Sequence, residues 1–405
     1  MLCRSCKSNK LELVIDLGNQ YLSDFRNDDK KPNKYPLELM RCTECNFVQL
    51  KESAPLSEMY TENYGFKSGT NEIIRKDLKD IVEQARSYVD KYQPNDFPGN
   101  PISLHVLDIA SNDGELLNNY PKNYFRVGVD PITKLCKEAE KCADVIINEF
   151  FPPKKEFLYK FDIITAISCF YDVEDPANFL GEMVKILKDD GVIIIQQNYI
   201  LATLQNNAYD NICHEHIGYH SLKSMEHLFD RFGLECVDVS TSMVNGGALR
   251  TVCQKKGIGT PTKAVQDQRD IETAYELDTA VPYLRFRGRV ENTAREVKSL
   301  INKINASGEK CYIYGASTRG GTIWQYVGLD VKDLPFAVDR NPDKVGKKIA
   351  SIGVPIISEE QARLDKPEYM LVSIWFFSSS VINREIEYLK SGGHLILPLP
   401  ELTIL

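Results

Sequence analysis

The chain has 405 residues, of which 43% are hydrophobic and 26% are charged, as expected for a globular protein with more than one domain. Its formal net charge of −8 argues against a general nucleic-acid-binding protein and against a basic surface that docks on membranes. The longest apolar runs are too short to span a bilayer, and the opening "MLCRSCKSNK" lacks the apolar core of a signal peptide, so we expect a cytoplasmic protein.

Two Cys-x-x-Cys pairs lie near the start of the chain, and their members are Cys3, Cys6, Cys42 and Cys45. The total of 11 cysteines is odd, which disfavours a framework of disulfides. Each pair places two sulfurs on one side of a turn, so the two turns supply four thiolates for a tetrahedral zinc ion. Residues 11–20 and 35–50 have the pattern of flanking strands. The sequence therefore predicts a zinc-ribbon-like module over residues 1–55, with a structural zinc; a redox dithiol is the alternative.

The central part, residues 56–256, alternates strand and helix signals, which predicts a doubly wound parallel sheet that binds its ligand at the carboxyl ends of the strands. His105–Tyr120 reads as strand, tight turn and helix, and the next strand ends at Asp130. The turn at 110–114 is polar and acidic and lacks the Gly-x-Gly-x-x-Gly pattern of dinucleotide sites, so it suits a cationic ligand that carries a nucleoside. This pattern resembles class I S-adenosylmethionine methyltransferases, although any Rossmann-like sheet is the alternative. The expected cofactor-binding residues are Asp108, Ala110, Asn112, Asp113, Gly114, Asp130, Pro131, Ser168 and Gln197.

The C-terminal part, residues 257–405, repeats the strand–turn–helix pattern after a long helical connector at 274–310 that contains Pro282. The turn that opens the new helix contains Gly315, Ser317, Thr318, Arg319 and Gly320. Backbone N–H groups at a helix start favour an anion, and Arg319 adds a charge suited to a phosphate. Asp339 closes the next strand and would suit a ribose hydroxyl. We expect a Rossmann-like domain that holds a nucleotide diphosphate; a degenerate repeat without a ligand is the alternative.

The chain resembles one family along essentially its whole length. The resemblance is carried by four features in order: the two cysteine pairs, "SNDGELL" after a strand, the downstream "HEH" and the second Rossmann-like unit. The family is that of the bacterial C-methyltransferases of nucleotide-linked 4-keto-deoxysugars. The resemblance implies a zinc module, a central class I S-adenosylmethionine methyltransferase domain and a C-terminal domain that helps to hold the nucleotide sugar. The chain departs from the family at Ala110, where glycine is usual, and at Cys213, where better-known members have tyrosine. It also has "SCFYDVEDP" at 168–176, where asparagine and histidine are frequent, so Asp172 or Cys213 could take a catalytic role.

Methylation at carbon needs a carbon nucleophile, and a sugar with a ketone at carbon 4 has an acidified C–H bond on carbon 3. The stretch "NICHEHIGYH" (211–220) follows a late strand, near the expected cofactor. We predict that His216 is the general base and that Glu215 polarises the site or binds the sugar. The family resemblance implies that a tyrosine, here Tyr64, faces the same pocket. The expected substrate-binding residues are Tyr60, His214, Asn245, Arg250, Gly315, Ser317, Thr318 and Arg319.

Other interpretations of these residues stay open. His214, His216 and His220 could hold a second zinc ion, or the segment could be a structural polar loop. The prediction is S-adenosylmethionine-dependent methylation at carbon 3 of a nucleotide-linked 4-keto-6-deoxyhexose. A sugar O- or N-methyltransferase is one alternative, and a non-catalytic nucleotide-sugar-binding protein, suggested by Ala110, is another. The nucleotide (dTDP, GDP or CDP), the product stereochemistry and the oligomeric state carry no prediction.

Overall fold

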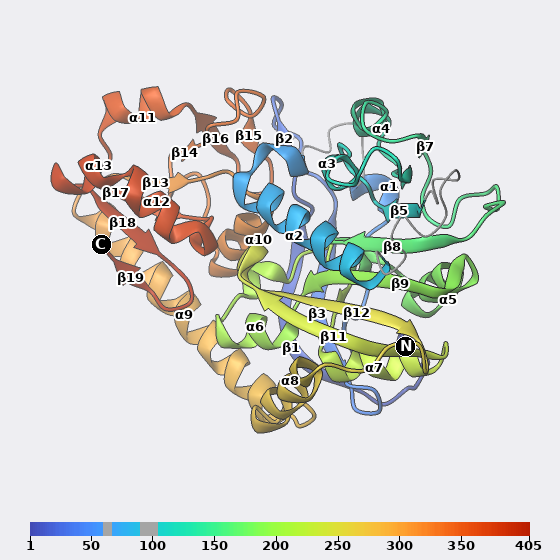
Figure 1. Ribbon diagram of the computed structural model, residues 1–405. Helices are drawn as coiled ribbons and strands as arrows, with labels where there is room; N and C mark the ends of the chain where they lie inside the picture. The colour runs from blue at the N-terminus through green and yellow to red at the C-terminus, as the bar shows by residue number, and fades with distance from the viewer. Residues whose placement is uncertain (60–66, 90–103) are drawn as a thin grey trace.

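The computed structural model describes residues 1–59, 67–89 and 104–405, and these residues form three β-sheets with helices around them (Figure 1). The first sheet belongs to the N-terminal module and has the strand order β1-β3-β4-β10. Cys42 ends β3, and Cys45 lies in the turn between β3 and β4, so the hairpin carries one of the two cysteine pairs. The strands are β1 (Leu11–Tyr21), β3 (Lys34–Cys42), β4 (Val48–Leu50) and β10 (Gly218–Tyr219).

The central sheet confirms the doubly wound arrangement. Its order is β7-β6-β5-β8-β9-β12-β11, which along this unit of the chain reads 3-2-1-4-5-7-6. The first five strands pair in parallel, whereas β12 pairs antiparallel with both β9 and β11. The strand order reverses between β5 and β8, which is where such sheets bind ligands. The strands are β5 (His105–Ile109), β6 (Phe125–Val129), β7 (Val145–Ile147), β8 (Phe161–Ile167), β9 (Leu187–Asn198), β11 (Leu234–Ser242) and β12 (Ala248–Lys255).

Helices pack on both faces of the central sheet. Ile74, Leu78 and Ile81 recur every three or four residues along α2, so they form one apolar stripe. This stripe forms a buried cluster with Val106 and Ile163 of the sheet. Figure 1 shows α2 lying over the central sheet. The helices of this part are α1 (Leu56–Met59), α2 (Glu72–Val89), α3 (Glu115–Asn118), α4 (Thr133–Ala139), α5 (Pro176–Lys185), α6 (Ile200–Gln205) and α7 (Leu222–Asp230).

The helical connector predicted over 274–310 contains one long helix, α9 (Val281–Ala306), and a separate helix, α8 (Lys263–Ala274), precedes it. Pro282 lies in the first turn of α9, where its missing N–H costs no helical hydrogen bond. Figure 1 shows α9 running along one edge of the molecule towards the C-terminal part.

The C-terminal sheet has the order β19-β18-β17-β13-β14-β16-β15-β2, with a parallel centre from β18 to β16. It is the predicted second Rossmann-like unit. Its strands are β13 (Cys311–Tyr314), β14 (Ala337–Val338), β15 (Lys348–Ile349), β16 (Val354–Ile357), β17 (Tyr369–Val372), β18 (His394–Leu397) and β19 (Thr403–Ile404). Its helices are α10 (Thr318–Val327), α11 (Glu359–Asp365), α12 (Ser378–Arg384) and α13 (Ile386–Lys390).

Two short strands cross between the three parts. β2 (Phe25–Arg26) leaves the N-terminal module and pairs with β15 at the edge of the C-terminal sheet. β10 follows the "HEH" segment and pairs with β4 of the N-terminal sheet. The zinc module is therefore hydrogen-bonded to both of the other parts of the chain.

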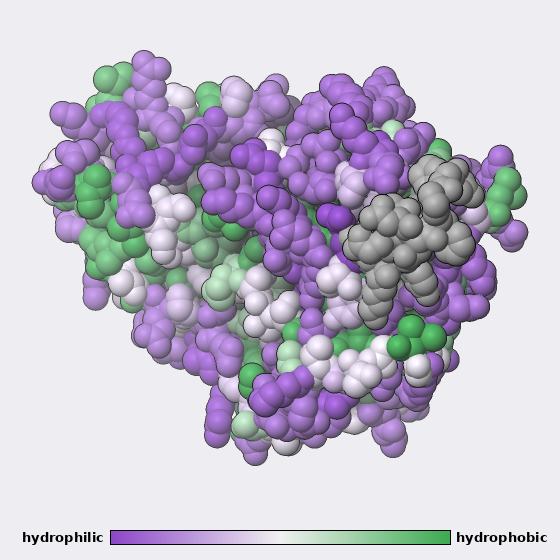
Figure 2. Space-filling model, viewed as in Figure 1, coloured by the Kyte–Doolittle hydropathy of each residue, from purple (hydrophilic) through white to green (hydrophobic). Residues whose placement is uncertain are grey.

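The surface is mainly polar. Figure 2 shows that hydrophilic residues cover most of the viewed face and that hydrophobic residues gather in small groups beside the two chain ends. In the described part of the chain, no helix has both the length and the apolar character needed to cross a bilayer.

Candidate functional site

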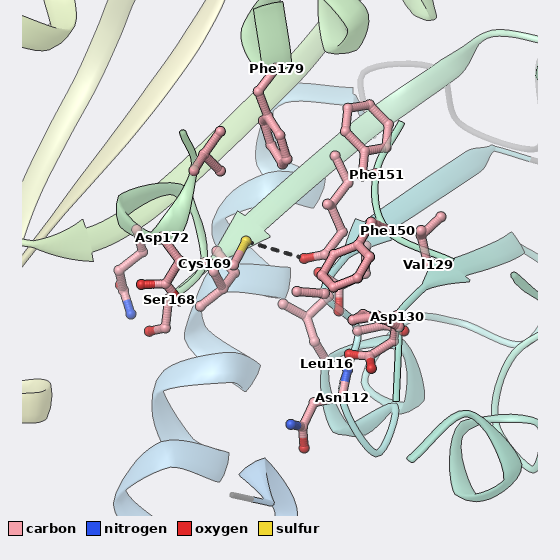
Figure 3. Close-up of a pocket in the computed structure, with 18 of the residues that line it drawn as sticks. Asn112, Leu116, Val129, Asp130, Phe150, Phe151, Ser168, Cys169, Asp172 and Phe179 are labelled. Carbon is pink, nitrogen blue, oxygen red and sulfur yellow. Dashed lines mark hydrogen bonds between the residues drawn. The ribbon is translucent and has the colours of Figure 1, made fainter. Parts of the chain in front are cut away.

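A cavity of about 340 Å³ opens at the carboxyl ends of β5, β6, β8 and β9, where the strand order reverses. Figure 3 shows Phe151 and Phe179 at one end, Asn112 and Asp130 at the other, and Ser168 with Asp172 along a third side. An apolar aromatic end and a polar end suit a ligand that joins a flat base to polar and charged groups.

Left-handed backbone marks this cavity. Four of its lining residues have a positive φ although they are not glycine: Ala110 (58°), Asn112 (52°), Ser168 (56°) and Asn245 (53°). Such conformations cost energy in residues with a Cβ and tend to gather at functional sites. The usual glycine of the family at position 110 is explained by this backbone, and Ala110 adopts the same conformation.

Asp130 is held ready to accept hydrogen bonds from a ligand. Its Oδ2 accepts the Asn112 N–H at 2.9 Å and its Oδ1 accepts the Ile132 N–H at 2.8 Å. Burial raises the pKa of this carboxyl, while the two N–H groups oppose the rise. Each oxygen keeps a second lone pair, so the carboxylate can also accept two ribose hydroxyls.

Asp108 is a buried carboxyl at the end of β5. Its Oδ1 accepts the Thr165 hydroxyl at 2.6 Å, and burial raises its pKa to about 7. A cation bound in the cavity would favour the ionised form. The cavity residues therefore fit S-adenosylmethionine, which carries adenosine, a sulfonium and an ammonium group.

Other expected cofactor residues lie behind the cavity. Asp113 accepts the Gly69 N–H at 3.0 Å, and Gly114 packs so closely on α4 that a Cβ would lie 2.5 Å from the Cys142 sulfur. Neither lines the cavity, nor does Gln197, whose amide contacts Met225 on the opposite side of β9. Its neighbour Gln196 lines the cavity instead, because successive side chains of a strand point to opposite faces.

The four cysteines of the N-terminal module lie together, with all sulfurs within 4.8 Å of one another. Two of the distances, Cys3 to Cys45 and Cys6 to Cys42, are 3.6 Å. A tetrahedral zinc with Zn–S bonds of about 2.3 Å needs sulfurs roughly 3.8 Å apart. The cluster therefore fits a closed, structural zinc site.

His216 lies beside the cavity, where its ring packs edge-on against Tyr171, the residue before Asp172. Its Nδ1 is 2.9 Å from the Asn211 carbonyl oxygen. The side-chain amide nitrogen of Asn198 is 3.1 Å from the same Nδ1. The carbonyl contact places the proton on Nδ1 and the lone pair on Nε2, whereas donation from Asn198 would place the proton on Nε2. Burial, aided by the charge of Arg319, lowers the His216 pKa to about 3. The imidazole is therefore neutral at physiological pH and keeps a free lone pair, while these surroundings disfavour its protonated form.

The other polar residues of "NICHEHIGYH" have different surroundings. His214 Nε2 donates to the Tyr35 carbonyl of the N-terminal module at 3.1 Å. Burial raises the pKa of Glu215 and lowers that of His220 to about 3. Among the described residues, the four cysteines are the group whose ligand atoms come close enough for a metal, so the three histidines do not form a second cluster there.

A second cavity, also about 340 Å³, lies at the C-terminal unit. Gly315, Ala316 and Ser317 form one wall, and Asn71 and Ile73 at the start of α2 form part of another. The basic residues that line it are Arg340, Lys344 and Arg384. Asp339 and Glu359 also line it and lie 3.7 to 3.9 Å from these basic groups, so both charges face the cavity, which reaches from the C-terminal unit towards the methyltransferase part.

The backbone of the second cavity repeats that of the first. Asp339 Oδ2 accepts the Ala316 N–H and Oδ1 accepts the Asn341 N–H, both at 2.8 Å. Asp130 makes the corresponding pair of bonds, to the loop after the first strand and to the residue two positions later. Asp339 is thus placed for a ribose in the same way as Asp130.

Several expected substrate residues serve other contacts. Arg250 is buried, pairs with Asp77 (2.9 Å) and Asp80 (2.6 Å) of α2, and donates to Gln196 (2.8 Å). It supports two lining residues, Asp77 and Gln196, from behind. Thr318 and Arg319 do not line the second cavity, whereas Asn245 lines the first. Tyr60 and Tyr64 lie outside the described residues.

Comparisons with known proteins match three consecutive parts of the chain. A zinc-binding-domain model matches residues 3–60, a methyltransferase-domain model matches 73–239, and the C-methyltransferase C-terminal-domain model matches 243–400. The C-methyltransferase NovU of Streptomyces niveus is 26% identical over 421 aligned residues, which cover 98% of this chain and 95% of that protein.

Solved structures were also compared. Magnesium protoporphyrin IX methyltransferase from Synechocystis PCC 6803, with bound S-adenosylmethionine, is 10% identical with a TM-score of 0.34, covering 45% of this chain and 79% of that chain. An S-adenosylmethionine-dependent methyltransferase from Clostridium acetobutylicum is 15% identical with a TM-score of 0.35, covering 45% and 92%.

Proposed function

Because this chain belongs to the S-adenosylmethionine-dependent C-methyltransferases that join a zinc-binding, a methyltransferase and a C-terminal domain, we propose that it methylates carbon 3 of a nucleotide-linked 4-keto-6-deoxyhexose. The observation that carries the proposal is the pairing of two cavities. One fits S-adenosylmethionine and borders His216, and the other is lined by basic residues and by the ribose-accepting Asp339.

The chain's own residues prepare the cofactor cavity. Bound S-adenosylmethionine supplies an electrophilic methyl group on a sulfonium sulfur. Asp130 holds the ribose, Asp108 compensates the positive charge, and Phe151 and Phe179 provide an apolar wall. Four cysteines hold the structural zinc outside this cavity.

The proton transfer is assigned to His216. Its Nε2 lone pair removes the proton from carbon 3, and the electron pair of that C–H bond forms the enolate with the carbon 4 ketone. The enolate carbon would then bond to the methyl group as the methyl–sulfur bond breaks; the electron pair of that bond would stay on sulfur, S-adenosylhomocysteine would leave, and the carbon 4 ketone would re-form. With the proton on Nδ1, His216 donates to the Asn211 carbonyl, which supports the imidazolium that forms. Glu215, the preceding residue, is assigned the role of stabilising that positive charge or of binding the sugar.

The substrate's nucleotide is assigned to the second cavity. The loop Gly315–Ser317 lies at the start of α10, where the helix dipole favours an anion, and Arg340 and Lys344 add positive charge for a diphosphate. The ribose hydroxyls would meet Asp339, as the Asp130 geometry suggests for the cofactor. Tyr60 and Tyr64 remain predictions, since they lie outside the described residues.

The test is methyl transfer from S-adenosylmethionine with a ¹³C-labelled methyl group to dTDP-, GDP- and CDP-linked 4-keto-6-deoxyhexoses, with the new bond located by NMR. A new carbon–carbon bond at carbon 3 with one nucleotide preferred is the expected result. A methyl on oxygen or nitrogen would contradict the enolate step and favour the O- or N-methyltransferase. Binding of a nucleotide sugar without any transfer would favour the non-catalytic protein.

A further inference from the structure

Arg319 lies close in sequence to the wall of the second cavity, but its side chain does not line that cavity. The residue follows the lining Ser317 by two positions, on the first turn of α10. Its Nε donates to Asp210 Oδ2 at 2.9 Å, and its Nη2 lies 2.8 Å from the same oxygen. The Arg319 side chain is 12% exposed and that of Asp210 is 0% exposed, so the ion pair is withdrawn from water.

Asp210 ties this pair to the segment of His216. It lies on the short helical turn Tyr209–Asn211, and the Asn211 carbonyl holds His216 Nδ1. The indole N–H of Trp375, also from the C-terminal unit, donates to the same Asp210 oxygen at 3.0 Å. Two side chains of the C-terminal unit therefore fix the segment that orients the proposed base.

Arg319 also reaches the wall of the cofactor cavity. Its Nη1 donates to the carbonyl of Asn245, which lines that cavity with a left-handed backbone. The guanidinium lies 4.4 Å from the ring centre of Phe376, which covers its face. The Arg319 side chain thus contacts both Asp210, in the segment that orients His216, and Asn245, in the wall of the cofactor cavity. Its helix, α10, begins beside the second cavity.

A buried ion pair of this kind is a poor source of stability, because removing both charges from water offsets their attraction. Its value lies in fixed geometry, which the planar guanidinium provides by donating in several directions at once. An ammonium group would keep the charge but could not reproduce the same set of contacts.

We propose that Arg319 is a positioning residue that links the nucleotide cavity to the cofactor cavity and to His216, rather than a phosphate ligand. That the ligand of the second cavity is a nucleoside diphosphate rests on the proposed function. Nucleotide bound at the Gly315–Ser317 loop restricts the motion of the first turn of α10. Because Arg319 on that turn bonds to Asp210 and Asn245, the motion of these two residues is restricted as well. The two ligands therefore bind with positive cooperativity.

The experiment measures binding of S-adenosylhomocysteine by calorimetry, with and without saturating dTDP, GDP or CDP. In the wild type we expect nucleotide to tighten binding by about fivefold or more. In Arg319→Lys, the factor by which nucleotide tightens S-adenosylhomocysteine binding should fall towards one. The Kd for the nucleotide should stay within about twofold of the wild-type value. Arg269→Lys is the control, since Arg269 also pairs with one carboxylate, Glu226, between α7 and α8, though more exposed, and should keep the full factor.

Hydrogen–deuterium exchange without ligands gives a second readout. In Arg319→Lys, residues 209–220 and 243–247 should exchange faster than in the wild type, while β5 stays unchanged. An undiminished coupling factor or unchanged exchange would overturn the proposal, as would nucleotide binding weakened by about tenfold, which is the signature of a lost phosphate contact. If no nucleotide binds the wild type, the proposed substrate class fails, while the exchange data still decide the role of Arg319.

Discussion

At the scale of single residues, the lining of the cofactor cavity can be predicted where a short stretch of sequence determines it. The turn after β5 and the acid after β6 were expected from sequence, and Ala110, Asn112 and Asp130 line the cavity. Gln196 was missed in favour of Gln197, because β9 is buried on both faces and its sequence shows no alternation. The direction of Arg319 could not be predicted either, since its partner Asp210 lies 109 positions earlier.

Asp108 gives the cofactor site a pH dependence. Burial raises its pKa to about 7, so in the ligand-free protein the carboxyl is increasingly protonated below that pH. Cofactor cations favour the ionised form, so affinity should rise with pH through 7, by up to about tenfold per unit below it. Calorimetry with S-adenosylhomocysteine, whose ammonium group remains, from pH 5.5 to 8.5 measures this. Asp108→Asn should bind weakly with a flat profile; an equally steep profile in the variant would refute the assignment.

His216 should matter for turnover and not for cofactor binding. We expect His216→Gln to lower kcat by about 10²- to 10⁴-fold, because the proton acceptor is lost. The Kd for S-adenosylhomocysteine should stay unchanged, since His216 does not line the cavity. With a pKa of about 3, its protonation should not limit the rate of the wild type between pH 5 and 8. Retained turnover in the variant would assign the base elsewhere, with Asp172 the next residue to test.

At the scale of elements, the long strands and helices follow from periodicity, whereas the shortest strands do not. β2 and β10 have two residues each, too few to show a pattern, and they exist because partner strands offer free edges. β10 joins the segment that carries His216 to the zinc module. Leu50 N donates to Ile217 O at 2.8 Å, and the Phe47 ring lies 4.6 Å from that of His220.

Removing zinc should therefore disturb residues 217–220, which directly follow His216. Phe47 follows the ligand Cys45 by two residues, so loss of the metal frees the turn that supports β10. After chelation, exchange of amide hydrogens at 217–220 should accelerate and methyl transfer should fall, while β5 stays protected. Added zinc should restore both. Unchanged exchange at 217–220 in the zinc-free protein would show that the module does not support this segment.

At the scale of the whole molecule, the three predicted parts are present but interlocked, and buried histidines make its stability depend on pH. His220 is 1% exposed between Phe47 and Phe170, and burial lowers its pKa to about 3. Between roughly pH 6.5 and 3 the unfolded chain binds a proton there that the folded chain does not. Stability contributed by this group is thus present at neutral pH and is lost as the pH falls, by about 1.4 kcal/mol per unit.

The melting temperature should consequently drop between pH 7 and pH 5. His220→Leu should show a shallower pH dependence, whatever its absolute stability, because no imidazole remains to take up the proton. His227→Gln is the control, since His227 is exposed and should leave the slope unchanged. A slope in His220→Leu as steep as in the wild type would place the sensitive group elsewhere.

Carbon-acid chemistry in a nucleotide sugar is the central claim, and solvent exchange tests it most directly. The enzyme, loaded with S-adenosylhomocysteine so that no methyl transfer occurs, is incubated in D₂O with the nucleotide-linked 4-keto-6-deoxyhexose that it binds best. The account predicts that NMR shows loss of the carbon 3 proton signal at a rate that depends on enzyme, and that His216→Gln abolishes this loss. A carbon 3 proton retained in the wild type, under conditions where S-adenosylmethionine supports methyl transfer, would contradict it.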